Sequence, residues 1–323
     1  MKIAVIDDYQ NAFKTLKCFP KLAGHDVVVY TDTANDVASL AEKLKDADAV
    51  VLTQQRSYFP RALVEKLPKL KLIGQTGRAA THVDLQACTE KGIIVSAGGS
   101  GNPNATAELT WGLILSSLRN LPFEVTSLKN GRWQSTLGVG VSGKTIGIYA
   151  YGKIGSIVAA VGRAFGARVV CWGREGSTGR AKAAGFEVAK SREEFFADAD
   201  ILSLHLPLNN ETRGIVTGED LARMKPTARI VNASRAGLIA KGALIAALKA
   251  GRPGFAAVDV YDTEPVGGDE ALVQMDNVTC TPHLGYVTRE SYEEYYATVV
   301  DDLVNFAAGK PSNVLNPDAL GKK

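Results

Sequence analysis

Residues 145–162 read TIGIYAYGKIGSIVAAVG, and this stretch decides the fold of the chain. An apolar run (TIGIYA) comes first, a turn with two glycines (YGKIG) follows, and small and apolar residues then continue in a helical pattern. In this order a strand feeds a tight turn and a helix whose free N–H groups can hold a pyrophosphate. The stretch therefore predicts a dinucleotide turn at the start of a parallel α/β sheet.

The glycines of this turn have separate roles. Gly152 allows the backbone to approach the phosphates closely, and Gly155 allows the helix to pack tightly on the strand. The usual first glycine of the motif is replaced by Ala150, whose methyl group is tolerable if its φ is negative and could still crowd the cofactor. The predicted cofactor-binding residues of the turn are Ala150, Gly152, Lys153, Ile154 and Gly155.

The end of the next strand predicts which dinucleotide binds. An acidic residue is expected there for the ribose of NAD, but the chain reads CWGRE, with Gly173 at that place and Arg174 after it. An arginine suits a 2′-phosphate, so the sequence favours NADP(H). The alternative is that Arg174 is a solvated turn residue and Glu175 binds the ribose of NAD(H).

Strand and helix patterns alternate along both halves of the chain, which predicts the α/β class with two Rossmann-like, doubly wound parallel sheets. A break rich in Gly, Asn and Pro at residues 98–104 suggests a hinge, and a long helix follows with Asn104 as its N-cap. The terminal amphipathic helix, residues 289–309, could carry the chain back to the first domain. We therefore expect a discontinuous substrate-binding (catalytic) domain, residues 1–101 and 288–323, and a nucleotide-binding domain, residues 102–287.

Composition excludes several other classes of protein. The 323 residues are 46% hydrophobic and 22% charged, with a formal net charge of +3, and no run of like charges suggests a nucleic-acid or polybasic membrane contact. No apolar run approaches the roughly 18 residues needed to cross a bilayer. The four cysteines are scattered without metal-ligand spacing, so we expect reduced thiols, no metal and a cytoplasmic location.

Three further segments, NASRAG, DVYDTEP and TPHLGY, each follow an apolar run that resembles a buried strand. They carry Arg235, Glu264 and His283. Polar groups at the carboxyl ends of parallel strands line the ligand crevice of such a sheet. An arginine can hold a substrate carboxylate with two charge-assisted hydrogen bonds, a histidine can deliver a proton, and a glutamate can keep the histidine charged and oriented. These three residues are the predicted catalytic set.

In their order, the motifs YAYGKIG, SLHLPLNNETRGIV, MKPTARIVNASRAGLI, AAVDVYDTEP and TPHLGYVT resemble the D-isomer-specific 2-hydroxyacid dehydrogenases, the family of glyoxylate/hydroxypyruvate reductases and phosphoglycerate dehydrogenase. The resemblance covers essentially the whole chain. It implies an oxidoreductase that transfers a hydride between NADP(H) and a small 2-oxo or 2-hydroxy acid with D specificity. It also implies a homodimer formed largely through the nucleotide domain and an arm that follows its first helix.

The resemblance also implies roles for further residues. Asp259 looks like the residue that binds the nicotinamide carboxamide, and the segment QTGRAATHVD resembles a loop whose backbone N–H groups bind the substrate carboxylate. That loop departs from the family pattern at Ala79 and His82, so the substrate stays open. Further cofactor-binding candidates are Thr106, Thr212, Ala233 and Gly285; substrate-binding candidates are Thr76, Gly77, Arg78, Ala79 and, after the third strand, Arg56.

Two alternative functions remain at this point. Formate and phosphite dehydrogenases share the architecture, but formate dehydrogenases resemble it with an amide where Glu264 stands, so phosphite oxidation is harder to exclude. The other alternative is a nucleotide-sensing binding protein related to corepressors, which an intact catalytic set disfavours.

Overall fold

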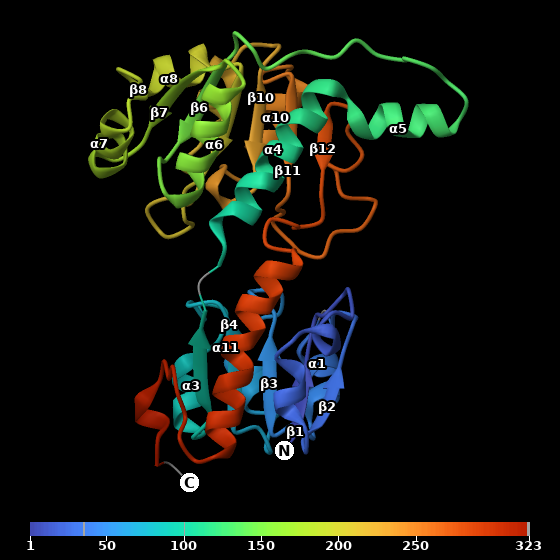
Figure 1. The fold of residues 1–323 in the computed structure, drawn as a ribbon, viewed down its shortest axis with the longest axis vertical. Helices are drawn as coiled ribbons and strands as arrows, with labels where there is room; N and C mark the ends of the chain where they lie inside the picture. The colour runs from blue at the N-terminus through green and yellow to red at the C-terminus, as the bar shows by residue number, and fades with distance from the viewer. Residues whose placement is uncertain (35, 100, 322–323) are drawn as a thin grey trace. The chain divides into compact units, whose positions relative to one another are not determined.

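The computed structural model describes residues 1–34, 36–99 and 101–321 and divides into two compact units. Unit 1 comprises Met1–Asn102 and Thr288–Lys323, and unit 2 comprises Pro103–Val287 (Figure 1). Residue 35 of the predicted first domain, residue 100 of the predicted hinge and residues 322–323 at the predicted end lie outside the described residues.

Unit 1 is built on a five-stranded parallel sheet in the order β2-β1-β3-β4-β5. Its strands are rich in Val, Ile and Ala, as expected for a sheet buried on both faces. The order of the strands reverses between β1 and β3, so the loops that follow these two strands diverge at the carboxyl edge of the sheet. The strands are β1 Lys2–Val5, β2 Asp26–Val29, β3 Ala49–Leu52, β4 Leu72–Thr76 and β5 Ile94–Gly98.

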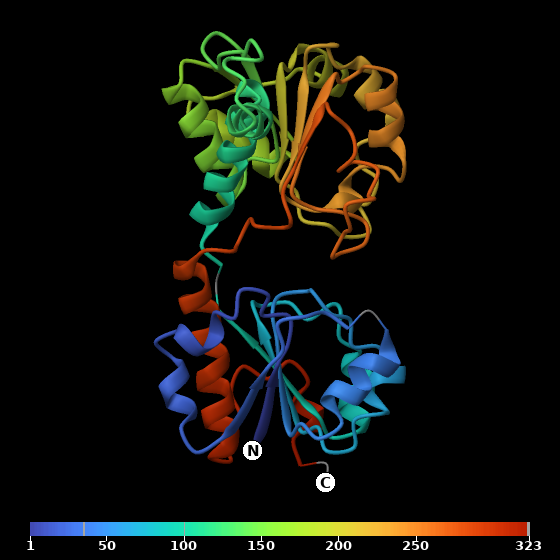
Figure 2. The ribbon, with the colours of Figure 1, turned by 90° about the vertical axis from the view of Figure 1, so that its right-hand side faces the viewer.

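Helices cover both faces of this sheet (Figure 2). One face packs against α1 Val37–Leu44, α2 Arg61–Val64 and α3 Leu85–Glu90, and the other against α11 Arg289–Ala307. The last helix lies so close to β4 that a Cβ at Gly74 would approach Val299 Cγ1 to 2.9 Å. The terminal helix thus packs on the first unit. Short 3-10 turns complete the unit: η1 Phe13–Thr15, η2 Phe19–Leu22 and η4 Pro317–Ala319.

Unit 2 is built on a seven-stranded parallel sheet in the order β12-β11-β10-β9-β6-β7-β8. The strand order reverses between β6 and β9, and this switch point is where ligands bind in doubly wound sheets. The strands are β6 Thr145–Tyr149, β7 Arg168–Trp172, β8 Glu187–Val188, β9 Ile201–Leu204, β10 Arg229–Asn232, β11 Phe255–Val258 and β12 Val278–Cys280. The predicted α/β class with two doubly wound parallel sheets is confirmed.

Helices also lie on both faces of the second sheet (Figure 2). One face packs against α4 Pro103–Arg119 and α6 Lys153–Ala164; the other packs against α8 Arg192–Asp198, α9 Gly218–Arg223 and α10 Ala243–Lys249. The remaining elements are α5 Leu121–Lys129, α7 Glu175–Ala183 and η3 Ala236–Leu238.

The long helix after the predicted hinge begins before the predicted position. It begins at Pro103, so Asn104 lies inside α4 and the predicted N-cap is wrong. A proline suits the first helical turn because its missing N–H would have no acceptor there. The helix ends at Arg119 because Asn120 adopts a left-handed conformation with φ of 50°. A second helix, α5, then extends away from the sheet of unit 2 (Figure 1).

Candidate active site

The structure brings two of the predicted catalytic residues, His283 and Glu264, into contact at the carboxyl edge of the unit 2 sheet. Glu264 follows β11 and His283 follows β12, two adjacent parallel strands. His283 Nδ1 lies 2.5 Å from Glu264 Oε2. The two side chains retain 25% and 29% of their exposure, so the pair is partly shielded from water yet still accessible. With Nδ1 engaged, Nε2 is the ring nitrogen left to face a substrate.

The Glu264 carboxylate is fixed from two sides, because its Oε1 also accepts a hydrogen bond of 2.9 Å from the backbone N–H of Tyr261. Burial acts to raise the pKa of Glu264. The hydrogen bond and charge of His283, the Tyr261 N–H and the charge of Arg235 outweigh it and hold this pKa below its ordinary value. The carboxylate therefore remains ionised at neutral pH and can stabilise an imidazolium.

Arg235 reaches the same edge from the loop after β10. Its guanidinium donates to the backbone oxygen of Ser234 at 2.7 Å, and its own backbone oxygen accepts a bond of 2.9 Å from Asn232 Nδ2. The charge of Arg235 also acts on Glu264, so all three predicted catalytic residues contribute to one electrostatic environment. A fixed cation beside a histidine–carboxylate pair can bind an anion and stabilise charge on a reacting oxygen.

Asp259 holds the loop that carries His283. Its buried carboxylate accepts hydrogen bonds from Thr281 Oγ1 (2.6 Å) and from the backbone N–H groups of Leu284 (2.8 Å) and Gly285 (2.9 Å). His283 itself has φ of 54°, an uncommon left-handed conformation that a histidine adopts only when its surroundings enforce it. These three bonds supply that constraint.

The same loop is joined to the start of the first helix of unit 2. Thr106 Oγ1 in α4 donates to the backbone oxygen of Gly285 at 2.9 Å. A Cβ on Gly285 would lie 3.3 Å from Asp259 Oδ2, closer than most side-chain contacts. The predicted cofactor-binding residues Thr106, Asp259 and Gly285 thus form one cluster around His283.

The predicted dinucleotide turn lies at the switch point. Gly152 is the N-cap of α6, and a Cβ placed there would meet nothing within 4 Å, so its surface side is open. Gly155 has no such freedom, because a Cβ there would lie 2.3 Å from the Ala150 carbonyl oxygen. Lys153 and Ile154 form the first turn of the helix. The open N-terminus of α6 fits a pyrophosphate.

Ala150 differs from the condition set by the sequence, because its φ is +76° rather than negative. In the left-handed region a Cβ approaches the following carbonyl, which costs about 1–2 kcal/mol for residues other than glycine. The N–H of Ala150 is held by the Trp172 carbonyl at 2.8 Å, so the register of β6 with β7 maintains the conformation. The turn keeps the shape of the glycine motif despite the substitution.

At the next strand, Gly173 has φ of +154° and Arg174 is the N-cap of α7. Arg174 forms an ion pair with Glu211, and both side chains are largely exposed, at 72% and 73%. Glu211 lies in the loop after β9 together with Thr212, whose hydroxyl donates to the Pro207 carbonyl at 2.6 Å. The last predicted cofactor residue, Ala233, follows β10 and packs against the core on the α4 and α6 side.

The predicted substrate loop belongs to unit 1 and follows β4. Thr76 is buried and its hydroxyl donates to the Leu52 carbonyl at 3.0 Å, whereas the Gly77 N–H donates to the Gly98 carbonyl at 2.9 Å. Neither group is therefore directed at a ligand here. Arg78 and Ala79 are exposed, and among the described residues their N–H groups have no backbone acceptor. These two amides are the part of the loop that can bind an anion.

Arg56, the remaining substrate candidate, lies in the loop after β3 and is already engaged inside unit 1. Its guanidinium donates to the Asp7 carbonyl and, at 3.2 Å, to the Tyr292 hydroxyl. It also lies over the Tyr9 ring, 4.6 Å from the centroid. Three contacts give Arg56 a structural role that the sequence did not reveal.

His82 shows that a histidine near the substrate loop need not be a catalyst. Its side chain is buried, and neither ring nitrogen has a hydrogen-bond partner among the described residues. Burial lowers the pKa of His82 to about 4, so the ring is neutral at physiological pH. It packs edge-on against Tyr58 with ring centroids 6.5 Å apart.

Three residues that support the site were not singled out by the sequence: Tyr261, Asn232 and Glu211. Tyr261 and Asn232 contact predicted catalytic residues through local backbone geometry, which no motif spacing encodes. Glu211 could have been suspected only from its place in the loop after a strand at the switch point.

Within the described part of the chain no group of three or more His, Cys, Asp or Glu is arranged to hold a metal, and no helix there is long and apolar enough to span a membrane.

Known proteins resemble this chain in both sequence and structure. The family model "D-isomer specific 2-hydroxyacid dehydrogenase, NAD binding domain" matches residues 111–285. The D-3-phosphoglycerate dehydrogenase of Methanocaldococcus jannaschii is 38% identical over 280 residues, which cover 86% of this chain and 53% of that protein. The glyoxylate reductase of Aeropyrum pernix is 34% identical over 292 residues, which cover 87% of both chains.

A solved structure from Ralstonia solanacearum, described as a "putative D-3-phosphoglycerate dehydrogenase oxidoreductase", superposes with a TM-score of 0.96 at 47% identity, covering 99% of this chain and 98% of that one. By contrast, the chain spans about half the length of the curated phosphoglycerate dehydrogenases of Methanocaldococcus jannaschii and Bacillus subtilis, 53% and 55% respectively. Similar proteins thus carry different substrate names and different lengths.

Proposed function

The chain belongs to the D-isomer specific 2-hydroxyacid dehydrogenase family, as the sequence resemblance predicted, and from this premise we propose that it reduces a small 2-oxo acid to the D-2-hydroxy acid with NADPH. One observation carries the proposal: the 2.5 Å contact between His283 and Glu264, with the charge of Arg235 acting on the same carboxylate. This arrangement provides a proton donor and an anion-binding cation at one sheet edge.

The residues present fit a dinucleotide at the switch point of unit 2. The open N-terminus of α6 at Gly152 would hold the pyrophosphate, and Asp259, Thr106 and Gly285 would lie at the nicotinamide end around His283. Thr212 and Ala233, in the loops after β9 and β10, would line the intervening wall. When bound, the nicotinamide supplies the hydride for the carbonyl carbon.

The side chains of this chain supply the remaining chemistry. His283 donates a proton from Nε2 to the substrate oxygen, while Glu264 on Nδ1 keeps the ring oriented and stabilises its charged form. Arg235 holds the substrate carboxylate and stabilises the negative charge that develops on the carbonyl oxygen. In unit 1, the amides of Arg78 and Ala79, which have no backbone acceptor among the described residues, can bind an anion.

NADPH is preferred over NADH in this proposal because Gly173 replaces the ribose-binding acid and Arg174 follows it at the start of α7. A glycine removes the carboxylate that would repel a 2′-phosphate, and an arginine can pair with that phosphate. Glyoxylate and hydroxypyruvate are the substrates we propose to test first, since a relative of comparable length is a glyoxylate reductase.

A homodimer is part of the proposal. α5 and the segment after it expose an unusual set of large apolar side chains, and such contiguous patches typically mark protein interfaces. We propose that a second copy covers them, which sedimentation velocity would test. The exposed side chains are Leu121, Phe123, Val125, Leu128, Trp133 and Leu137.

All four cysteines are free, as in proteins of reducing compartments, and we propose a cytoplasmic location.

The decisive experiment is a panel of 2-oxo acids assayed by NADPH and NADH absorbance, with phosphite and formate assayed for NAD reduction beside it. We expect turnover with one or more oxo acids, faster with NADPH, and the D enantiomer as product. Turnover only with phosphite or formate would replace the proposal with the other dehydrogenase class. Binding of NADPH without turnover on any of these compounds would favour a nucleotide sensor.

A further inference from the structure

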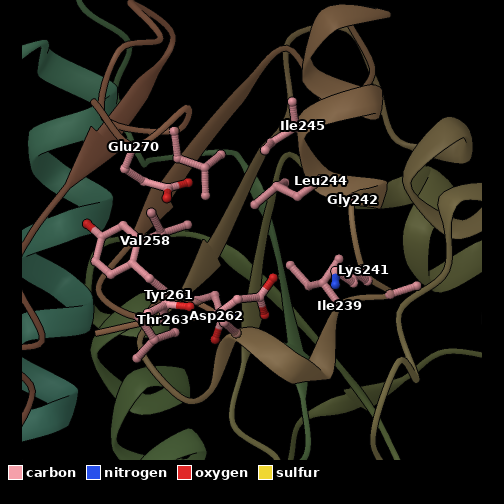
Figure 3. A pocket seen from close by; sticks show the side chains of 15 residues that line it. Ile239, Lys241, Gly242, Leu244, Ile245, Val258, Tyr261, Asp262, Thr263 and Glu270 are labelled. Carbon is pink, nitrogen blue, oxygen red and sulfur yellow. The ribbon is translucent and has the colours of Figure 1, made fainter. Parts of the chain in front are cut away.

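Unit 2 contains a pocket on the α10 side of its sheet, with a cavity volume of about 160 Å³ (Figure 3). Its walls come from the end of β10 and the segment after it, the end of β11, the start of α10 and the loop that continues to residue 272. None of the residues of the dinucleotide turn, 150–155, lines it. The pocket is therefore separate from the site proposed for the nucleotide.

The pocket adjoins the loops that carry two of the proposed catalytic residues. Ala236, which follows Arg235 in the chain, and Thr263, which precedes Glu264, both line it. Tyr261 also lines it and donates its backbone N–H to Glu264 Oε1 and its hydroxyl to the Thr281 carbonyl, each at 2.9 Å. A molecule that moves Tyr261 would therefore move the carboxylate that orients His283.

The lining combines apolar and charged side chains. The apolar part comprises Ile239, Leu244, Ile245, Val258, Val260 and Leu272. Figure 3 shows Lys241, Asp262 and Glu270 on different sides of the pocket. In the described ranges 1–34, 36–99 and 101–321, none of these three side chains forms an ion pair with another residue. Two carboxylates against one ammonium leave the rim with a net negative charge.

The size and charge of the pocket define the chemistry of its ligand. A cavity of about 150 Å³ is enough for a molecule the size of benzene, so a nucleotide or a peptide is too large. An apolar body suits the interior, and a cationic head suits the two carboxylates. We propose that this pocket binds a small aliphatic ammonium compound, whose cationic group is attracted by the negative charges of Glu270 and Asp262, and that its occupancy changes turnover through Tyr261.

Two sources share this chemistry, and Lys241 distinguishes them. A simple alkylamine has no carboxylate to pair with Lys241, whereas the carboxylate of an aliphatic α-amino acid can form an ion pair with the lysine. Titration calorimetry on the full chain would compare n-butylamine and L-norvaline, with n-butanol as the uncharged control. Tighter binding of L-norvaline, lost in Lys241→Met, would identify an amino-acid site; tighter binding of n-butylamine, unchanged in Lys241→Met, would identify an amine site.

The location of binding is tested by Glu270→Gln and Asp262→Asn, each expected to weaken both ammonium probes about tenfold. Asp269→Asn, a neighbouring exposed carboxylate that does not line the pocket, should leave their affinity unchanged. No heat from either probe, equal affinity for n-butanol, or full affinity in both lining variants would overturn the site.

The effect on turnover rests on the proposed function and is measured separately. Initial rates of hydroxy-acid oxidation are the appropriate readout, because an amine would condense with a 2-oxo acid supplied as substrate. A probe at a concentration that just saturates the wild type should change kcat in the wild type and in Asp269→Asn, and change it clearly less in Glu270→Gln. Binding with an unchanged kcat would overturn the coupling to Tyr261 and leave the site. A chain that oxidises no hydroxy acid at all would overturn the proposed function instead, while the calorimetry would still decide the site.

Discussion

Two cation–carboxylate pairs lie at the carboxyl edge of the unit 2 sheet, and they differ in almost every physical respect. His283–Glu264 retains 25% and 29% side-chain exposure, and a backbone N–H holds the carboxylate from its other side. The side chains of Arg174 and Glu211 are 72% and 73% exposed, and their ion pair joins two surface loops. Water and salt screen the second pair far more than the first.

The difference suggests that the two pairs serve different purposes. A shielded pair with a third partner keeps its geometry throughout a reaction, which a proton donor requires. An exposed pair contributes only about 0.2–1 kcal/mol and is readily exchanged for another anion. We therefore expect mutations of the first pair to lower turnover and mutations of the second pair to change cofactor choice.

The largest expected effect is that of His283→Gln. Glutamine cannot donate a proton as an acid catalyst, so kcat should fall by about 10²–10⁴-fold while NADPH affinity changes little. Single-turnover absorbance and nucleotide titration would measure both. His25→Gln, in unit 1, is the matched control and should leave turnover unchanged. Near-normal turnover of the His283 variant would remove the residue from the mechanism.

Glu264→Gln should have the next largest effect. It keeps the size of the side chain but removes a charge-assisted hydrogen bond worth about 1.5–3 kcal/mol, so kcat should fall about tenfold to a hundredfold at pH 7. The pKa of Glu264 is held below its ordinary value, so the ionised carboxylate contributes stability above the ordinary glutamate range, and this contribution is lost as pH falls through the folded pKa.

The stability difference between the wild type and Glu264→Gln should therefore be constant at neutral pH and shrink in acid. Denaturant unfolding at a series of pH values would measure it. A difference that grows as the pH is lowered would contradict the assigned role of His283 as the partner of an ionised carboxylate.

The fold and the shielded pair were predictable from sequence because both follow from regular backbone. The apolar runs that precede Arg235, Glu264 and His283 imply parallel strands, and parallel strands bring their carboxyl ends to one edge. Contact between residues in the loops that follow the adjacent strands β11 and β12 needs no long-range information beyond that order. The same reasoning could not identify Asn120 as the residue that ends α4, since a left-handed asparagine leaves only a weak signal.

Loop conformation set the limit of what the sequence could predict. Ala150 was expected to need a negative φ. Its φ is instead +76°, and its N–H donates a hydrogen bond to the Trp172 carbonyl in this conformation. Arg56 forms hydrogen bonds with Asp7 and Tyr292, which are distant from it in the chain, and no motif spacing predicts these bonds. The Arg174–Glu211 pair likewise depends on how the loops after β7 and β9 meet.

Arg174→Ala tests the exposed pair as a determinant of cofactor choice. If the guanidinium pairs with the 2′-phosphate, the substitution should cost about 1.5–3 kcal/mol of NADPH binding and leave NADH binding nearly unchanged. Fluorescence titration with both nucleotides would measure this. Lys182→Ala removes the same charge from the exposed far end of α7 and serves as the control. An unaltered NADPH/NADH ratio in Arg174→Ala would refute the assignment.

The smallest expected effect is that of Glu211→Gln, and it distinguishes the two pairs most sharply. Glu211 competes with a 2′-phosphate for Arg174, so its removal should strengthen NADPH binding by about 1.5–5-fold, the equivalent of an exposed pair of about 0.2–1 kcal/mol. The gain should shrink as salt is added, because screening already weakens the competing pair. Glu219→Gln, an exposed glutamate in α9, is the control. Weaker NADPH binding in Glu211→Gln would mean that the glutamate orients Arg174 rather than competing for it, and the contrast between a fixed pair and an exchangeable pair would fail at this edge.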